Sequence, residues 1–271
     1  MLHGLAIDTP VRQAVAPAPG DEIREALAYR IPIYRLLSGV FLEEPGVAFL
    51  DALRSPDSLA ALAEAGLAFD PDFLAPDTAS LGERLAEEYA SMFAASGGFP
   101  PIESVRLTGR LKQDPYFAVT QTYSRFGFQV GDVRFFVFED QLGVELAFVA
   151  ELLDRAQDAL AGNDDAEYRR LEKEVKRFWA VHLGKWVRGY ARLVQRAAEH
   201  SLYREMARLL ESFADEEIAL LGLRLEDEDQ ARPVVPKSEI QVAFNPDEPV
   251  CGACSRGPQS LLARLEGSHA A

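Results

Sequence analysis

The chain has 271 residues, a hydrophobic content of 48% and a formal net charge of −15. This length and composition are typical of a globular protein with enough apolar residues to bury a sizeable core. The negative charge disfavours nucleic acids and anionic membrane surfaces as partners, because both repel an acidic protein. We therefore expect no nucleic-acid partner. No stretch approaches the roughly 18 apolar residues of a membrane span, so we also expect no membrane span.

The N-terminal residues do not have the pattern of an export signal. Residues 1–20 are rich in alanine and proline and lack a basic start followed by an apolar core, which predicts a flexible tail. Only two cysteines occur, Cys251 and Cys254, and this number excludes a disulfide framework. We therefore expect a cytoplasmic protein.

Helical patterns follow this tail. They are bounded by charged residues, prolines and glycines, and they cover 22–41, 47–53, 55–66 and 84–94. Asp21 can cap the first helix, and Pro32 inside it predicts a kink or a break because proline has no backbone N–H. Ser80 and Glu83 have the capping-box spacing and predict the start of the fourth helix. A loop is expected at 96–107, and Asp114 begins a further helix that ends at Gly127.

Three stronger helical patterns occupy the second half of the chain. The first has apolar residues at spacings of four, three and four, which form one stripe: Leu142, Leu146, Val149 and Leu153. The second is long, covers 171–200 and contains Gly184, which predicts a bend. The third covers 201–222. His182 lies on the apolar stripe of the long helix, where a core histidine is more frequent than a ligand.

The sequence predicts an all-α fold. Short strands at 133–138 and 240–244 remain alternatives, but no βαβ rhythm and no sustained heptads occur. We expect a single-domain helical bundle over 21–222. A flexible tail precedes it at 1–20, and an acidic, proline-containing tail follows it at 223–271, with a short helix at 259–266.

The C-terminal tail contains the sequence CGAC. Two thiolates at the spacing of Cys251 and Cys254 provide half of a four-ligand zinc site, and His269 is the nearest further candidate. A thioredoxin-type redox role would need a βαβ setting, which the sequence lacks. A reduced pair without metal is the favoured interpretation, and zinc or another metal at these two cysteines is the alternative.

No catalytic motif is visible in the sequence. It has no P-loop, no H-E-x-x-H pair of zinc ligands and no Gly-x-Ser-x-Gly nucleophile elbow. We therefore expect a protein that is not an enzyme and that holds no resident cofactor.

Four segments between residues 23 and 220 resemble, in the right order, the TorD/DmsD-type chaperones that mature molybdenum-cofactor oxidoreductases, with the NarJ group as near relatives. The segments are YRIPIYRLLSGVFLEEP, LAEEYASMFAASGGFPPIESVRL, EDQLGVELAFVAELL and FWAVHLGKWVRGYARLVQRAAEHSLYREMARLLESF. The resemblance implies an all-helical domain of the TorD-like type. It also implies a chaperone that binds the leader peptide, with its twin arginines, or another segment of a client catalytic subunit. The client is thereby held for cofactor insertion before export or assembly.

The resemblance also suggests where the client binds. The family signature reads Pro-Asp-His where this chain has Glu139, Asp140 and Gln141, and an amide cannot act as a protonated imidazole. A twin-arginine leader offers two guanidinium groups followed by an apolar stretch, so its receptor needs carboxylates beside an apolar groove. We expect the client-peptide site at Glu139, Asp140, Gln141, Glu103, Ser104, Glu145, Tyr89 and Phe93.

Local sequence alone favours structural roles for several of these residues. Asp140 can cap the helix that follows it, and Glu139 complements the dipole of that helix. Glu145 fits equally well as a solvated surface acid, and Tyr89 and Phe93 fit core packing. Both interpretations remain open on the sequence.

The expected partners are a molybdoenzyme catalytic subunit and its basic leader peptide. The chain is expected to be a monomer or a domain-swapped dimer, in which the 127–138 connection acts as a hinge. A second hypothesis is a metal- or cofactor-binding accessory protein that acts through Cys251 and Cys254. Bound zinc or iron that is lost when both cysteines become serine would distinguish it.

Overall fold

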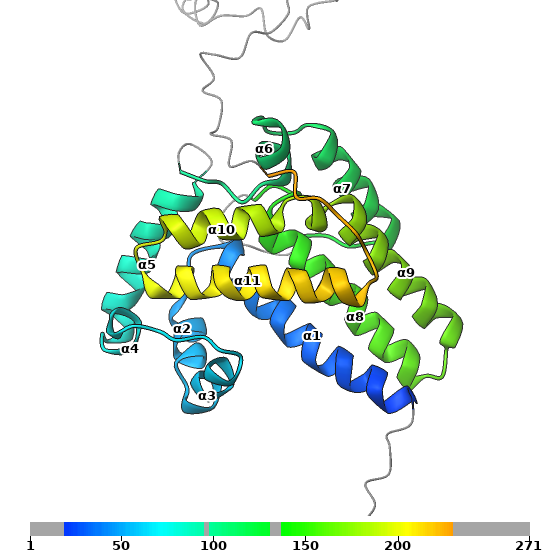
Figure 1. Cartoon of the computed structure of the whole chain (residues 1–271), viewed down its shortest axis with the longest axis horizontal. Coiled ribbons are helices and arrows are strands. Elements are labelled where there is room, and N and C mark those ends of the chain that lie inside the picture. Colours follow the sequence, from blue (N-terminus) through cyan, green and yellow to red (C-terminus); the bar gives the residue numbers. More distant parts are fainter. Residues whose placement is uncertain (1–18, 95–97, 131–136, 230–271) are drawn as a thin grey trace, which may run out of the picture. The chain divides into compact units, whose positions relative to one another are not determined.

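The described part of the fold is built from helices. In the computed structural model, the described residues are 19–94, 98–130 and 137–229, and they contain helices but no strand (Figure 1). The helices are α1 (Pro19–Leu42), α2 (Val47–Leu53), α3 (Pro56–Glu64), α4 (Pro71–Leu74), α5 (Thr78–Phe93), α6 (Glu103–Thr108), α7 (Asp114–Phe126), α8 (Leu142–Ala161), α9 (Asp165–Val181), the 3-10 helix η1 (Leu183–Lys185), α10 (Val187–Ala197) and α11 (Ser201–Leu220). The predicted all-α fold is confirmed.

Helices α1 and α8 pack closely against each other in the core. The Ser38 hydroxyl donates a hydrogen bond to the Gly143 carbonyl at 2.7 Å. A Cβ atom on Gly143 would lie 2.6 Å from the backbone nitrogen of Leu42, which is closer than any real side chain allows. Two helix backbones can therefore meet here only because residue 143 has no side chain.

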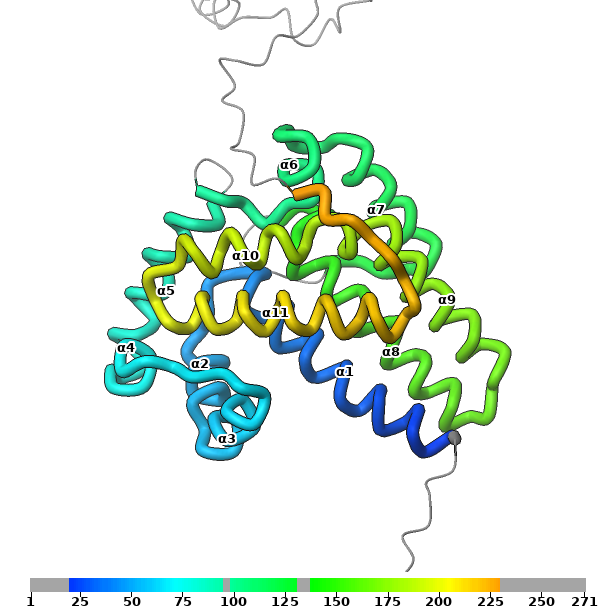
Figure 2. Tube along the Cα trace, in the orientation of Figure 1, coloured from blue at the N-terminus to red at the C-terminus, as the bar shows by residue number. Residues whose placement is uncertain are grey.

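A buried polar network joins α1 to α9 and α11. The Arg30 guanidinium forms two hydrogen bonds to the Glu217 carboxylate, at 2.7 and 2.8 Å. The Tyr34 hydroxyl donates to Glu217 at 2.7 Å and accepts from Trp179 Nε1 at 2.6 Å. Because each charged group has several partners, the network can lie in the core without an unpaired charge. Figure 2 shows α10 and α11 as an antiparallel pair at the front of the view, with α1 and α8 behind them.

The long helix that the sequence predicts over 171–200 is broken. Helix α9 ends at Val181, η1 follows, and α10 begins at Val187. Gly184, where the sequence predicts a bend, lies at this break. A Cβ on this residue would meet the Trp179 carbonyl oxygen at 2.6 Å and Leu225 Cδ1 at 2.4 Å. The chain therefore turns at the point where only glycine leaves room for its neighbours.

The structure differs from several other predicted helix boundaries and agrees with one of them. Helix α1 runs through Pro32 without a break. Helix α5 begins before the predicted position, because the Asp77 carboxylate caps it by accepting from Ser80 N–H at 3.0 Å. The expected loop at 96–107 contains the short helix α6, and the single turn α4 has no counterpart among the predicted elements. Gly127 ends α7 with a φ of 63°, as predicted.

Residues 223–229 pack on the helices, although the sequence placed them in the C-terminal tail. They run back from the end of α11 along η1 and α10 toward α6 (Figure 2). Glu228 N–H donates to the Lys185 carbonyl at 2.5 Å, and Gly189 N–H donates to Asp227 at 2.6 Å. Asp229 and Arg106, both with fully buried side chains, form an ion pair of 2.7 Å. The predicted N-terminal tail up to residue 18, the tail from residue 230 on, and most of the alternative strand at 133–138 lie outside the described residues.

We predict opposite effects for two glycine-to-alanine substitutions. Gly143→Ala would press a Cβ against the α1 backbone and should lower the free energy of unfolding by about 1–3 kcal/mol, the usual cost of overpacking. Gly82→Ala in α5 is the matched control, because its Cβ would lie 3.8 Å from Leu50 Cδ1, an ordinary contact. The better helix propensity of alanine should raise the free energy of unfolding there by about 0.5–1 kcal/mol. Urea unfolding followed by circular dichroism measures both, and a Gly143→Ala midpoint at or above that of Gly82→Ala would contradict the packing argument.

Candidate functional site

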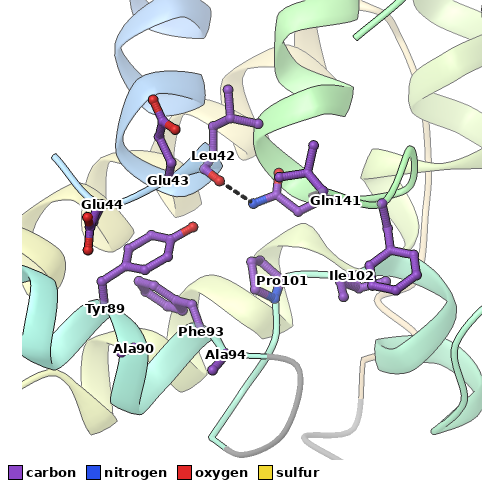
Figure 3. Close-up of a pocket in the computed structure, with 12 residues that line it drawn as sticks. Leu42, Glu43, Glu44, Tyr89, Ala90, Phe93, Ala94, Pro101, Ile102 and Gln141 are labelled. Carbon is purple, nitrogen blue, oxygen red and sulfur yellow. Dashed lines mark hydrogen bonds between the residues drawn. The ribbon is translucent and has the colours of Figure 1, made fainter. Parts of the chain in front are cut away.

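A cavity of about 390 Å³ lies where α1 and α5 end and α8 begins (Figure 3). We call it the α1–α5 cavity. Its apolar walls come from α5, from the chain just before α6 and from the chain just before α8: Tyr89, Ala90, Phe93, Ala94, Pro101, Ile102, Val137 and Phe138. Cavities of about 300–1,000 Å³ with mostly apolar walls are typical of ligand sites.

Two acids lie at the α1 side of this cavity. Glu43 and Glu44 follow the last residue of α1, and Figure 3 shows them beside the Tyr89 ring. The Tyr89 hydroxyl donates to the Phe41 carbonyl at 3.1 Å. Burial raises the pKa of Tyr89 well above its ordinary value, and the negative charges of Glu43 and Glu44 raise it further. The cavity is therefore apolar along its walls and negatively charged at one end.

Gln141 lines the cavity and ties two helix ends together. Its Oε1 accepts from Val144 N–H at 3.2 Å and thereby caps α8. Its Nε2 donates to the Phe41 carbonyl and, at 3.4 Å, to the Leu42 carbonyl at the end of α1. An amide offers a donor and an acceptor at every pH, so Gln141 can satisfy both helix ends without titrating.

Asp140 caps a different helix from the one that its sequence position suggests. Its Oδ2 accepts from Ser104 N–H at 2.9 Å, and its backbone carbonyl accepts from Glu103 N–H at 2.8 Å. Both hydrogen bonds are at the first turn of α6, whereas the cap of α8 is Gln141. Burial raises the pKa of Asp140, although the hydrogen bonds from Ser104 lower it. Asp140 therefore caps a helix, as predicted, but the helix is α6 and not α8.

Glu103 and His182 form a buried pair. Glu103 is 1% exposed and His182 is 3% exposed, and Glu103 Oε2 lies 2.9 Å from His182 Nδ1. The pair links the start of α6 to the break between α9 and α10. Ser104, the next residue of α6, is also fully buried.

Glu145 is not the surface acid that the sequence suggested as one alternative. Its side chain is fully buried, and neither carboxyl oxygen has a hydrogen-bond partner of good geometry among the described residues. Burial raises the pKa of Glu145 well above its ordinary value, and the charges of Glu103 and Asp140 raise it further. These effects favour a neutral carboxylic acid, which could not hold an exposed arginine.

The structure separates the predicted site residues into two groups. Tyr89, Phe93 and Gln141 line the α1–α5 cavity. The others do not line it, and apart from the half-buried Glu139 they are buried: Glu103, Ser104, Asp140 and Glu145. Their proposed contact with a client peptide stays a prediction, and in this conformation four of the five are closed off from solvent.

Sequence reasoning missed the acids that do line the cavity. Glu43 and Glu44 belong to EEPG, which was interpreted only as a helix end. Their position could have indicated a role at the site, because they lie at the end of the first segment that resembles the family. Phe138 was also missed, since its neighbours in the sequence drew attention to the acids that follow it.

Comparison with known protein families shows which family this chain belongs to. A family model described as the nitrate reductase delta subunit matches residues 55–192, about half of the chain. The chain belongs to this family. Membership confirms the resemblance to the NarJ and TorD group of chaperones.

Solved structures include a similar protein. A candidate redox enzyme maturation protein from Archaeoglobus fulgidus is similar at 20% identity and a TM-score of 0.43, over 69% of this chain and 93% of that chain. The comparison with curated proteins found no match.

The described residues hold no group of three or more histidine, cysteine, aspartate or glutamate side chains that could bind a metal ion. None of the described helices is long and apolar enough to cross a membrane. Cys251 and Cys254 lie outside the described residues, so the alternative metal site at this pair stays a prediction.

We predict that Glu145→Gln changes how stability depends on pH. The folded protein keeps the Glu145 proton at pH values where the unfolded chain has lost it, so the wild type should lose stability as pH rises above the ordinary glutamate pKa. The glutamine variant lacks this loss. Between about pH 5 and pH 7 the difference in unfolding free energy should move in favour of Glu145→Gln, by at most about 1.4 kcal/mol per pH unit. Urea unfolding at several pH values measures it.

The matched control is Glu151→Gln on the same helix, whose carboxylate is 42% exposed and paired with Arg155. This control should follow the wild type at each pH. A Glu145→Gln variant that also follows the wild type would contradict the buried, protonated state.

Proposed function

We propose that this chain is a cytoplasmic chaperone for the catalytic subunit of a molybdenum-cofactor oxidoreductase. In this proposal the α1–α5 cavity holds a segment of the client until the cofactor has been inserted. Membership of the nitrate reductase delta subunit family supports the class of function. The observation that carries the proposed site is a cavity of about 390 Å³ with apolar walls and two acids at one end.

The shape and charge of this cavity favour one kind of client segment. Side chains such as leucine or phenylalanine would bury apolar area against the half-buried Tyr89, Val137 and Phe138. Basic side chains next to them in the client would lie near Glu43 and Glu44, where carboxylates can accept charge-assisted hydrogen bonds. A leader peptide with twin arginines followed by an apolar stretch has this order of groups. The leader is therefore the proposed ligand, and another basic-then-apolar segment of the client would fit in the same way.

Binding of this kind needs no covalent chemistry and must be reversible, because the client leaves once it is mature. Charge contacts at the open end of a cavity are screened by salt, whereas the apolar contacts are not. The net charge of −15 adds a long-range attraction for basic segments and speeds their encounter with the chaperone. We therefore expect the affinity to fall as salt concentration rises, without being lost. The monomeric or domain-swapped state stays a prediction.

The client can be identified by purifying the tagged protein from its native host at low salt and analysing the bound proteins by mass spectrometry. A molybdoenzyme catalytic subunit among them is the expected result. Its absence, in repeated preparations that contain the expressed subunit, would overturn the proposed function.

We predict that filling the cavity prevents client binding. Ala90 is exposed, lines the cavity and lies on α5 (Figure 3), so Ala90→Trp should occupy the space without disturbing the core. Ala79→Trp is the matched control, because Ala79 is also exposed on α5 but does not line the cavity. Affinity for the client should fall by roughly tenfold or more in Ala90→Trp, a loss of about 1.4 kcal/mol, and little in the control. Titration of fluorescently labelled client peptide measures both, and equal affinities would place the client elsewhere.

A further inference from the structure

A second cavity lies between α7 and α9, and it shares no lining residue with the α1–α5 cavity. Its volume is about 390 Å³, and we call it the α7–α9 cavity. Its polar lining comes from α7, from α9 and from the residue that follows α9: Gln121, Thr122, Arg125, Glu174, Arg177 and His182. The sequence drew attention to none of these residues except His182, and there only as a core residue.

The α7–α9 cavity carries positive charge in an acidic protein. Arg125 is paired with Glu174 at 2.9 Å and also donates to the Thr122 hydroxyl at 3.2 Å. Arg177 forms no ion pair or hydrogen bond with any described residue, although carboxylates outnumber basic side chains by 43 to 28 along the chain. The lining has two guanidinium groups and one carboxylate, and the Glu103 carboxylate lies behind it, paired with His182. An anion would find here an arginine that pairs with no carboxylate of the described residues.

His182 adds a buried group with an unused nitrogen. His182 lines the α7–α9 cavity although the residue is only 3% exposed. Nδ1 is engaged with Glu103 at 2.9 Å, and Nε2 makes no hydrogen bond to any described residue. Each ring nitrogen of histidine can donate or accept a hydrogen bond, so Nε2 can donate to a ligand while Nδ1 is engaged with Glu103. A ring nitrogen without a described partner at a cavity lining is available to a ligand.

We propose that the α7–α9 cavity binds a small ligand through an oxyanion group, either a phosphate or a carboxylate, which Arg177 and His182 contact together. Arg177 supplies a forked pair of N–H donors, and His182 Nε2 supplies a donor that Glu103 holds in place. The cavity is larger than a single oxyanion, so the ligand has a body as well, which would lie against Val181 and Phe178. This site is independent of the client and of the α1–α5 cavity.

The test uses the full chain, with the imidazole nitrogens labelled for NMR and with ionic strength held constant by chloride. Inorganic phosphate and succinate are the two probes, and the one that binds more tightly shows whether the oxyanion is a phosphate or a carboxylate. The expected result is a saturable shift of the His182 Nε2 signal, with a dissociation constant of about 1 mM or lower for at least one probe.

Arg177→Gln should weaken this binding by roughly tenfold or more, because it removes the unpaired guanidinium. Arg196→Gln on α10 is the matched control, since Arg196 is exposed, has no described partner and lies outside the α7–α9 cavity. Both variants replace exposed side chains, and circular dichroism should show the wild-type fold. The proposal is overturned if neither probe produces a saturable shift, or if both variants bind the probes equally well.

Discussion

The junction at Asp140 and Gln141 holds three helix ends together, and the described structure around the α1–α5 cavity depends on it. Asp140 accepts the first N–H groups of α6, while Gln141 accepts from the start of α8 and donates to the last carbonyls of α1. Backbone groups at helix ends have no partner within their own helix, and a buried end needs one from elsewhere. Two adjacent side chains meet this need for three helices, and the α1–α5 cavity lies between the ends that they join.

This constraint explains why Asp140 is buried. The Asp140 carboxylate is fully buried and accepts the Ser104 N–H in the first turn of α6, so Asp140 serves the fold first. Glu145 reaches the same region from α8, and its neutral form avoids a third negative charge beside Glu103 and Asp140. Glu103 can then pair with His182 without further repulsion. The acids at the α1–α5 cavity itself come from the end of α1, where the chain is at the surface.

The two cavities share no lining residue, and His182 of the Glu103–His182 pair lines the α7–α9 cavity. One cavity is apolar with acids at one end, and the other is polar with an excess of arginine. A basic-then-apolar peptide suits the first, and an oxyanion suits the second. The two kinds of ligand are chemically opposite, so neither should compete for the site of the other.

The sequence by itself determined the all-α class and the helices with a clear apolar period, such as α8 and α11, because periodicity and end signals are properties of neighbouring residues. It also predicted a bend at Gly184, where the structure breaks the helix, and the end of α7 at Gly127. Only the tertiary structure decided that Asp140 caps a helix 36 residues earlier in the chain, that Glu145 is buried, and that Glu43 and Glu44 line the α1–α5 cavity. These outcomes depend on which distant segments meet, and a carboxylate has the same local signature whether it caps a helix, lies in the core or faces a ligand.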